Sequence, residues 1–412
     1  MSETKREKVL PYILIIVCFL IYFFAQISKH AISATANLFI QDYGVTNTEV
    51  GFATSAFLFC YGGGQIINGM LCRKYNTNLM VSIGLFLSCT CATLMYFNLP
   101  FIWYIILSGI NGLAQSFFWV LLLYKLSSTL DFKFMALSTI FMSLASTGGS
   151  LFSSALSALF VKNNNYKGVF LTAGILLMFS LAMWIALNVL IPNSKKDEAL
   201  EQTNVKKDVE NTGSNKSFIF LIVIFALLSA LTFGLSDSIK KWTPAFVTQF
   251  YGIADWISIL ISLVLPAIAL FTSFINTKIY KKIKDFNLII IIFSSIIAIL
   301  FIPLIIFLKK SVISTVILFS LISWCAGFII NVTTTQVPLY LARGKINAGL
   351  LGGVLNGTAY LGSALVVVLV GNVAENYSWV AVFPMLLGII LLCLFIAVVY
   401  QIVRSIARKR EN

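Results

Sequence analysis

Long apolar runs recur along the whole chain, and each is close to the length that a helix needs to cross a lipid bilayer. A helix rises about 1.5 Å per residue, so about 20 apolar residues span roughly 30 Å of hydrocarbon. Twelve such runs are expected, at 9–38, 47–72, 79–98, 101–128, 135–160, 168–192, 217–248, 254–277, 288–308, 311–341, 346–371 and 378–402. They predict an all-α integral membrane protein with twelve transmembrane helices.

The composition agrees with lipid as the main solvent. Of the 412 residues, 59% are hydrophobic and 11% are charged, against about 25% charged residues in an average soluble domain. This excludes a secreted domain, a disordered chain and a nucleic-acid-binding protein. The run at 9–38 is too long for a cleavable signal peptide, so we expect it to remain as a helix.

Groups that carry catalysis or bind metals are scarce within the apolar runs. His30 is the only histidine, and Asp237 is the only acidic residue in the interior of a predicted span. None of the seven cysteines belongs to a CxxC pair, so we expect buried free thiols. With one histidine and one membrane acid, no catalytic dyad or multi-histidine metal site can form. We expect no enzyme, no metal and no other cofactor.

One connector is polar throughout. Residues 193–216 read NSKKDEALEQTNVKKDVENTGSNK, which is typical of a flexible linker. The linker predicts a six-helix bundle at 1–192 and a second six-helix bundle at 217–412. An offset of 213 residues supports a duplication, because it relates Gly149 to Gly362, Ser150 to Ser363, Tyr166 to Trp379 and Phe170 to Phe383. Repeats of this kind place a substrate site at their interface near the middle of the membrane.

Small residues recur at every fourth position in the two segments that the offset relates. They are Ser146, Ser150, Ser154 and Ala158 in one segment, and Gly349, Gly353 and Gly357 in the other. This spacing lets helix backbones approach closely. We therefore expect these segments to pack tightly against neighbouring helices.

Basic residues are distributed unequally between the two sides of the predicted bundle. With the N-terminus inside, the inward segments hold 22 lysines and arginines, whereas the outward loops hold four. Cytoplasmic segments of membrane proteins carry such an excess. We therefore expect a multi-pass protein of the plasma (inner) membrane with both termini and the linker in the cytoplasm. The asymmetry also explains the net charge of +14 without a nucleic-acid partner.

The twelve spans, the central linker and a segment after the second span resemble the major facilitator superfamily over nearly the whole chain. In that segment Gly69, Leu71 and Lys74 match the superfamily pattern Gly-x-Leu-x-Asp-Arg-x-Gly-Arg-Arg, and Arg73 replaces its aspartate. The resemblance implies a gating loop that includes Gly69, Arg73 and Lys74. It also implies that the carboxylate which clamps the inner gate in relatives is absent.

Within the superfamily, the chain is most similar to the organophosphate:phosphate antiporters and related organic-anion carriers. The similarity lies in residues 44–61 (GVTNTEVGFATSAFLFCY), in 233–237 (FGLSD) with 242–244 (WTP), and in 349–379. Those antiporters hold phosphate with one arginine in each of the first and seventh helices. Here Lys29 and His30 stand at the first place and no arginine stands at the second. Because arginine binds phosphate through two parallel hydrogen bonds and lysine does not, specificity for phosphate esters is not implied.

Lys29 and Asp237 are the charged residues deepest in the predicted spans. An ionised side chain at a helix centre costs about 2.5–3.5 kcal/mol on insertion scales, so such residues face a cavity or a partner. Both lie about 20 residues from the cytoplasmic ends of their helices, and we expect them to pair across the two halves. The alternative is that Asp237 pairs with Lys240 or Lys241 on its own helix, while Lys29 extends toward the membrane surface.

Polar residues form a stripe on the first helix. Tyr22, Gln26, Lys29 and Ser33 are spaced by four, three and four residues, so they share a face that we expect to line water or substrate. The predicted substrate-binding set adds residues from other helices: His30, Gln115, Trp119, Asp237, Asn331, Asn356 and Tyr360. For the polar members outside the first helix, hydrogen bonding between helices is an equally good interpretation.

These features together predict a secondary active transporter that moves a small organic solute by alternating access. Basic residues outnumber Asp237 around the expected cavity, which favours an organic anion. The alternatives are a transporter-like membrane sensor of solutes and an efflux carrier for drugs or neutral solutes. The expected partners are a small-molecule substrate, a proton or an exchanged anion, and the lipid bilayer, and we expect a monomer.

Overall fold

The computed structural model describes residues 3–71, 76–190, 216–269, 285–338 and 348–411, together with 275, 279 and 283. Its first half contains α1 Glu3–Ala34, α2 Ala36–Tyr43, α3 Asn47–Leu71, α4 Thr77–Leu94, α5 Phe101–Thr129, α6 Phe132–Lys162 and α7 Gly168–Leu190. The second half contains α9 Lys216–Tyr251, α10 Asp255–Ser262, α12 Phe286–Phe307, α13 Val312–Asn331, the π-helix η1 Val332–Gln336, α15 Ala348–Asn376 and α16 Trp379–Glu411. Every regular element in the described ranges is helical.

The predicted all-α transmembrane class is confirmed. Within the described ranges, eleven helices are long and apolar enough to cross a membrane, and a shorter apolar helix covers Asp255–Ala269. That shorter helix lies in the predicted span 254–277, whose remaining part falls mostly outside the described residues. The predicted linker also lies outside them, except for Lys216.

Two predicted spans are interrupted. The run at 9–38 divides at Thr35, where α1 ends and α2 begins, and Gly44 then ends α2 in a left-handed conformation with φ 62°. Glycine adopts that conformation without steric strain, so it is well suited to end a helix. The run at 311–341 changes at Val332 from an α-helix to one π-helical turn. The mean hydropathy of a whole span registers neither change, although the π-helical turn itself has the polar sequence VTTTQ.

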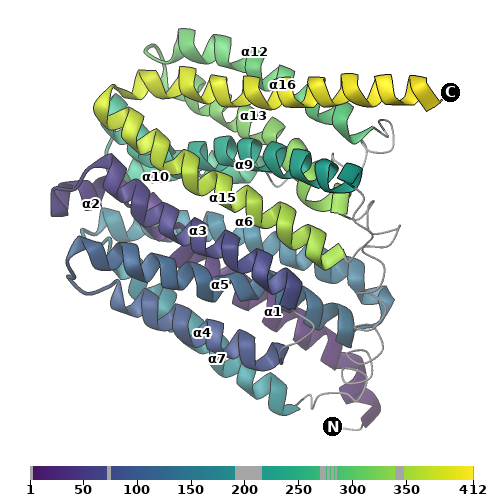
Figure 1. The fold of residues 1–412 in the computed structure, drawn as a ribbon. Helices are drawn as coiled ribbons and strands as arrows, with labels where there is room; N and C mark the ends of the chain where they lie inside the picture. The colour runs from purple at the N-terminus through teal and green to yellow at the C-terminus, as the bar shows by residue number, and fades with distance from the viewer. Residues whose placement is uncertain are drawn as a thin grey trace.

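The helices cross the molecule side by side, and both chain termini lie at one end (Figure 1). The opposite end carries α2, α10 and the turn between α15 and α16. Between the halves, α3 packs along α15, where a Cβ atom at Gly357 would collide with the carbonyl oxygen of Gly62. A Cβ atom at Gly353 would similarly press on Gly69. The expected close approach of the small-residue row at Gly353 and Gly357 is confirmed.

The two halves contain the same aromatic cluster. In the first half, the ring of Phe39 lies 4.9–6.1 Å from the rings of Tyr43, Tyr104, Tyr166 and Phe170. In the second half, the ring of Phe246 lies 5.2–5.6 Å from the rings of Phe250, Phe319, Trp379 and Phe383. Tyr166 and Phe170 thus occupy the places of Trp379 and Phe383, in accordance with the offset of 213 residues.

The helices that begin the two halves follow a different offset. A Cβ atom at Gly149 would collide with the carbonyl oxygen of Phe23, and one at Gly362 with that of Ala230. Positions 23 and 230 are 207 residues apart, as are Phe39 and Phe246. The same spacing relates His30, rather than Lys29, to Asp237. Lys29 is thus one residue, or about 1.5 Å, from the position in α1 that is equivalent to Asp237.

Candidate functional site

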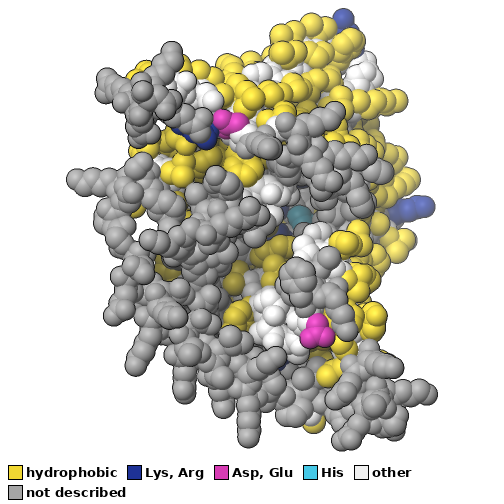
Figure 2. All heavy atoms as spheres, turned by 90° about the vertical axis from the view of Figure 1, so that its right-hand side faces the viewer, with side chains coloured by type: hydrophobic (Ala, Val, Ile, Leu, Met, Phe, Trp, Pro, Cys, Tyr) yellow, Lys and Arg dark blue, Asp and Glu magenta, His cyan; other side chains and the backbone are white. Residues whose placement is uncertain are grey.

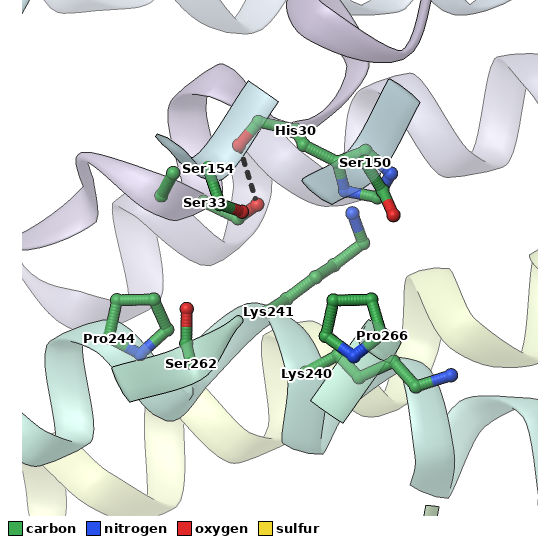
Figure 3. Close-up of a pocket in the computed structure, with 10 residues that line it drawn as sticks. His30, Ser33, Ser150, Ser154, Lys240, Lys241, Pro244, Ser262 and Pro266 are labelled. Carbon is green, nitrogen blue, oxygen red and sulfur yellow. Dashed lines mark hydrogen bonds between the residues drawn. The ribbon is translucent and has the colours of Figure 1, made fainter. Parts of the chain in front are cut away.

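A pocket with an empty volume of about 450 Å³ lies between α1 and α6 of the first half and the α9–α10 region of the second (Figure 3). Its lining residues are His30, Ser33, Ala34, Ser150, Ser154, Lys240, Lys241, Pro244, Ser262 and Pro266. Their polar groups are hydroxyls, one imidazole and two ammonium groups, and none of the ten residues is acidic. The lining therefore combines hydroxyl groups with positive charge.

Lys241 contributes a buried ammonium group to this pocket. The residue is 4% exposed, and its Nζ atom has no hydrogen-bond partner within the described part of the chain. Figure 3 shows its side chain extending from α9 toward His30 and Ser150, whereas Lys240 points elsewhere. An unpaired charge that is removed from water costs several kcal/mol. A ligand with a negative charge would remove that cost.

Asp237 does not supply the missing partner. One turn before Lys241, its Oδ2 atom accepts a hydrogen bond of 2.5 Å from Ser363 Oγ. Asp237 and Lys29 both interact with Lys241 electrostatically, one attracting and the other repelling it. Neither Lys240 nor Lys241 forms an ion pair with Asp237 in the structure, although all three residues are described. The same-helix ion pair that was the alternative for Asp237 is thus not formed here.

Lys29 lies between two tyrosine rings. Its Nζ atom donates a hydrogen bond of 3.0 Å to Tyr360 Oη and lies 4.7 Å from the ring centroids of both Tyr61 and Tyr360. Such cation–π contacts stabilise an ammonium group away from water. The predicted ion pair between Lys29 and Asp237 is absent from this structure, because each charge has other partners. Lys29 instead connects α1 of the first half to α15 of the second through a tyrosine.

Several predicted site residues gather around Lys29. Tyr22 Oη lies 3.5 Å from Tyr61 Oη, and the Tyr22 ring lies 5.2 Å from the Trp119 ring. Tyr61 and Phe233 pack against Tyr360 at 4.6 and 4.8 Å between ring centroids. Tyr61 and Phe233 were not among the predicted site residues, because aromatic residues in an apolar helix produce no distinctive pattern. These rings form an aromatic wall beside the lysine.

Other predicted site residues serve contacts between helices. Gln115 Nε2 donates to Ser28 Oγ at 2.7 Å and to Ser88 Oγ at 3.1 Å, which joins α5 to α1 and α4. Gln26 Nε2 donates to the Tyr22 carbonyl at 3.3 Å. The amide of Asn356 donates to Gln65 Oε1 across the halves. These contacts favour the interpretation of interhelical hydrogen bonding for Gln115 and Asn356.

The remaining predictions concern residues farther along the chain. Asn331, half-buried, is the last residue of α13, and its Oδ1 atom accepts a hydrogen bond of 3.5 Å from Gln336 in the π-helical turn. Gly69 is buried near the end of α3. Arg73 and Lys74 of the predicted gating loop lie outside the described residues.

At the end that carries α2 and α10, hydrogen bonds join the two halves. Gln249 Nε2 donates to Asn37 Oδ1 and Asn47 Oδ1, both at 3.1 Å, and its Oε1 atom accepts from Trp379 Nε1 at 2.9 Å. Asn37 also donates to Asp255 Oδ1 at 2.8 Å. Figure 2 shows the end with the termini, where a hollow is visible among the described side chains. We call the hydrogen-bonded group of Gln249, Asn37, Asn47, Trp379 and Asp255 the Gln249 cluster.

The contact between Lys29 and Tyr360 predicts a specific energetic coupling. In a double-mutant cycle on thermal stability, Lys29→Met and Tyr360→Phe should couple by about 1–2 kcal/mol, since a hydrogen bond to a charged group is lost. The cycle of Lys29→Met with Asp237→Asn should show a smaller coupling. A larger coupling to Asp237 would contradict the partners seen for both charges.

Family membership follows from the sequence as a whole. Residues 18–349 match the model of the Major Facilitator Superfamily. The chain belongs to this superfamily. Membership indicates a multi-pass membrane transporter rather than an enzyme, as the sequence analysis expected. No curated protein is significantly similar in sequence to the chain.

Solved transporters share the fold at low sequence identity. A D-xylose-proton symporter is 15% identical, with a TM-score of 0.76 over 93% of this chain and 97% of that one. The nucleoside transporter NupG is 14% identical, with a TM-score of 0.71 over 95% and 99% of the two chains. A bacterial homologue of the human lysosomal transporter Spinster, in an inward-facing conformation, is 13% identical, with a TM-score of 0.71 over 94% and 95%. These likenesses establish the fold and leave the substrate open.

Proposed function

We propose that this chain is a secondary active transporter for a small organic anion in the plasma membrane. The observation that carries the proposal is the buried and unpartnered ammonium group of Lys241 in the pocket between the halves. Lys240 and Lys29 add positive charge near it, and the carboxylate of Asp237 accepts a hydrogen bond from Ser363. An anionic substrate would pair with the ammonium group of Lys241. Binding would then be favoured, because it removes the cost of a buried, unpaired charge.

Transport would proceed by rocking of residues 1–192 against residues 217–412, with 193–216 as the cytoplasmic linker. The proposed substrate contacts are Lys241 and His30 in the pocket, with Lys29, Tyr22, Trp119 and Tyr360 beside it. In the proposed orientation, the Gln249 cluster closes the outer side while the hollow faces the cytoplasm. Similarity to the organic-anion branch supports this substrate class, whereas the absence of paired arginines speaks against phosphate esters.

The test combines binding with flux. Purified protein should show a raised melting temperature with one or more organic anions from a panel of carboxylates, phosphate esters, sugars and cationic drugs, because a ligand of the native state stabilises it. The same anion should accumulate in proteoliposomes when driven by a proton gradient or by exchange for internal anion. Binding without flux would indicate a solute sensor. Stabilisation by drugs or neutral sugars alone would overturn the anion proposal in favour of an efflux or neutral-solute carrier.

The proposed orientation predicts which thiols an impermeant reagent reaches. In a variant without native cysteines, a cysteine at Ser194 in the linker should resist a membrane-impermeant thiol reagent in intact cells, because the linker is cytoplasmic. A cysteine at Lys309, in a loop of the other side, should react readily. The measurement is the extent of labelling before and after permeabilisation. Fast labelling at position 194 in intact cells would reverse the assigned orientation.

A further inference from the structure

Three of the four serine hydroxyls in the pocket, those of Ser33, Ser150 and Ser262, are already committed as donors. Ser33 Oγ donates to the His30 carbonyl at 3.0 Å, and Ser150 Oγ donates to the Thr147 carbonyl at 2.8 Å. Ser262 Oγ donates to the Ile259 carbonyl at 2.6 Å. A serine hydroxyl has one proton and two lone pairs. With the proton used within its own helix, each of these oxygen atoms can only accept a further hydrogen bond from a ligand.

The pocket therefore has two chemically different parts. Lys241 offers three N–H donors and one positive charge, and its Nζ atom has no partner in the described part of the chain. Ser33, Ser150 and Ser262, on three different helical segments, offer acceptor oxygens around the same space. A complementary ligand has a negative group facing the lysine and O–H groups facing the serines. Figure 3 shows the ammonium group of Lys241 directed toward the side of the pocket that carries Ser150.

We propose that the pocket selects a hydroxylated organic anion, that is, a hydroxy acid or a sugar acid. The inference rests on the proposed anion transport and names the class of anion. The carboxylate would accept hydrogen bonds from Lys241, and the hydroxyl groups of the ligand would donate to the serine oxygens. An aliphatic carboxylate of equal length would cover those oxygens without giving them a hydrogen bond. A neutral polyol would leave Lys241 buried and unpaired.

These mismatches have measurable sizes. One lost hydrogen bond to a neutral group weakens binding by about tenfold, and loss of the charge partner weakens it by about tenfold to a hundredfold. Sites that are built to hydrogen-bond a substrate hydroxyl reject analogues without it by large factors, because the buried polar groups are left unpaired. The hydroxylated anion should thus bind at least about a hundredfold more tightly than the aliphatic acid, which loses several hydrogen bonds, and about tenfold to a hundredfold more tightly than the neutral polyol.

Three ligands of one chain length test the inference on the purified full-length protein. D-gluconate carries both features, hexanoate carries only the charge, and sorbitol carries only the hydroxyl groups. A parallel set of glycerate, propionate and glycerol covers a shorter ligand. We expect the melting temperature to rise with gluconate or glycerate at concentrations at which the matched analogues have no effect.

Every outcome of this comparison is decisive. If hexanoate or propionate stabilises the protein as well as the hydroxylated anion does, the hydroxyl inference is wrong and the proposed anion transport remains. If the polyols act as strongly as the hydroxylated anions, the charge has no role and the proposed anion function itself is wrong. If no member of either set stabilises the protein, a hydroxylated anion of this size is not the ligand and the inference fails.

A serine variant locates the effect in the pocket. Ser150→Ala removes one acceptor oxygen and should weaken binding of the hydroxylated anion about tenfold, with no loss for its aliphatic analogue. Ser295→Ala is a matched control, because Ser295 on α12 is also half-buried and also donates at 2.8 Å to a carbonyl of its own helix, that of Ile291. Equal effects of the two variants, or none of Ser150→Ala, would show that these oxygens do not contact the ligand.

Discussion

Replacing Lys241 by methionine should raise the melting temperature of the ligand-free protein and abolish uptake of the anion. A buried polar group without a partner costs about 1–3 kcal/mol, and a charged group costs more. Methionine has a similar length and no charge, so its introduction removes that cost while it fills the same space. The substrate loses its charged partner in the same step. A gain in stability together with a loss of function is the trade-off expected where a binding site keeps a destabilised group.

Two further variants complete this test. Lys309→Met removes a lysine from an exposed loop and should change neither the melting temperature nor the uptake by much. Lys241→Arg retains the charge but alters its shape, so it should retain weak uptake that Lys241→Met lacks. The measurements are thermal unfolding and initial uptake rates in proteoliposomes. Destabilisation by Lys241→Met would show that the ammonium group has a stabilising partner, and unchanged uptake would exclude Lys241 from substrate binding.

The positions of the membrane-spanning helices could be predicted, because the thickness of the membrane fixes the length of each apolar run. Each span must be apolar for about 20 residues, so the helices could be placed from composition alone to within a few residues. The break at Thr35 and the π-helical turn after Asn331 could not, because the mean hydropathy of a span does not report a local change in backbone hydrogen bonding. The aromatic pairs related by an offset of 213 residues were recognisable, since bulky rings in a repeated cluster leave a repeated pattern.

The candidate site was less predictable than the fold. Lys29 was recognisable as an interior charge, but its partner Tyr360 is 331 positions away and belongs to no charge pattern. Asp237 was expected to need a basic partner, whereas a serine hydroxyl serves it. Lys241 is left without a hydrogen-bond partner among the described residues, and no spacing rule indicates this. Depth in the membrane is a poor guide to partners, because Lys29 and Asp237 lie at similar depth and yet bond to Tyr360 and Ser363.

Replacing Gln249 by alanine should open the outer side of the transporter. The side chain of Gln249 links α9 to Asn37 and Asn47 of the first half, so its loss removes hydrogen bonds that exist only while this end is closed. At about 0.5–1.5 kcal/mol for each net hydrogen bond, the loss of these three bonds amounts to about 1.5–4.5 kcal/mol. The ratio of outward-open to inward-open molecules should rise by about tenfold or more, since 1.4 kcal/mol corresponds to a factor of ten.

A thiol in the pocket measures this change. Ser33→Cys in a background without native cysteines should react slowly with an impermeant reagent added outside intact cells, and the Gln249→Ala variant should react about tenfold faster. Asn376→Ala is the control, because Asn376 lies at the same end and bonds only to Asn372 of its own helix in the structure. Its labelling rate should not change.

The pattern of rates separates a specific gate from general loosening. Equal acceleration by Gln249→Ala and Asn376→Ala would mean that any truncation at this end admits the reagent, and the Gln249 cluster would not be the gate. No acceleration by Gln249→Ala would show that other contacts suffice, among which the hydrogen bonds from Thr48 to Glu375 also join the halves. In that case Gln249→Ala combined with Glu375→Gln should open the outer side. Since a closed outer gate is a condition for inward release, faster labelling should be accompanied by slower release of substrate to the inside.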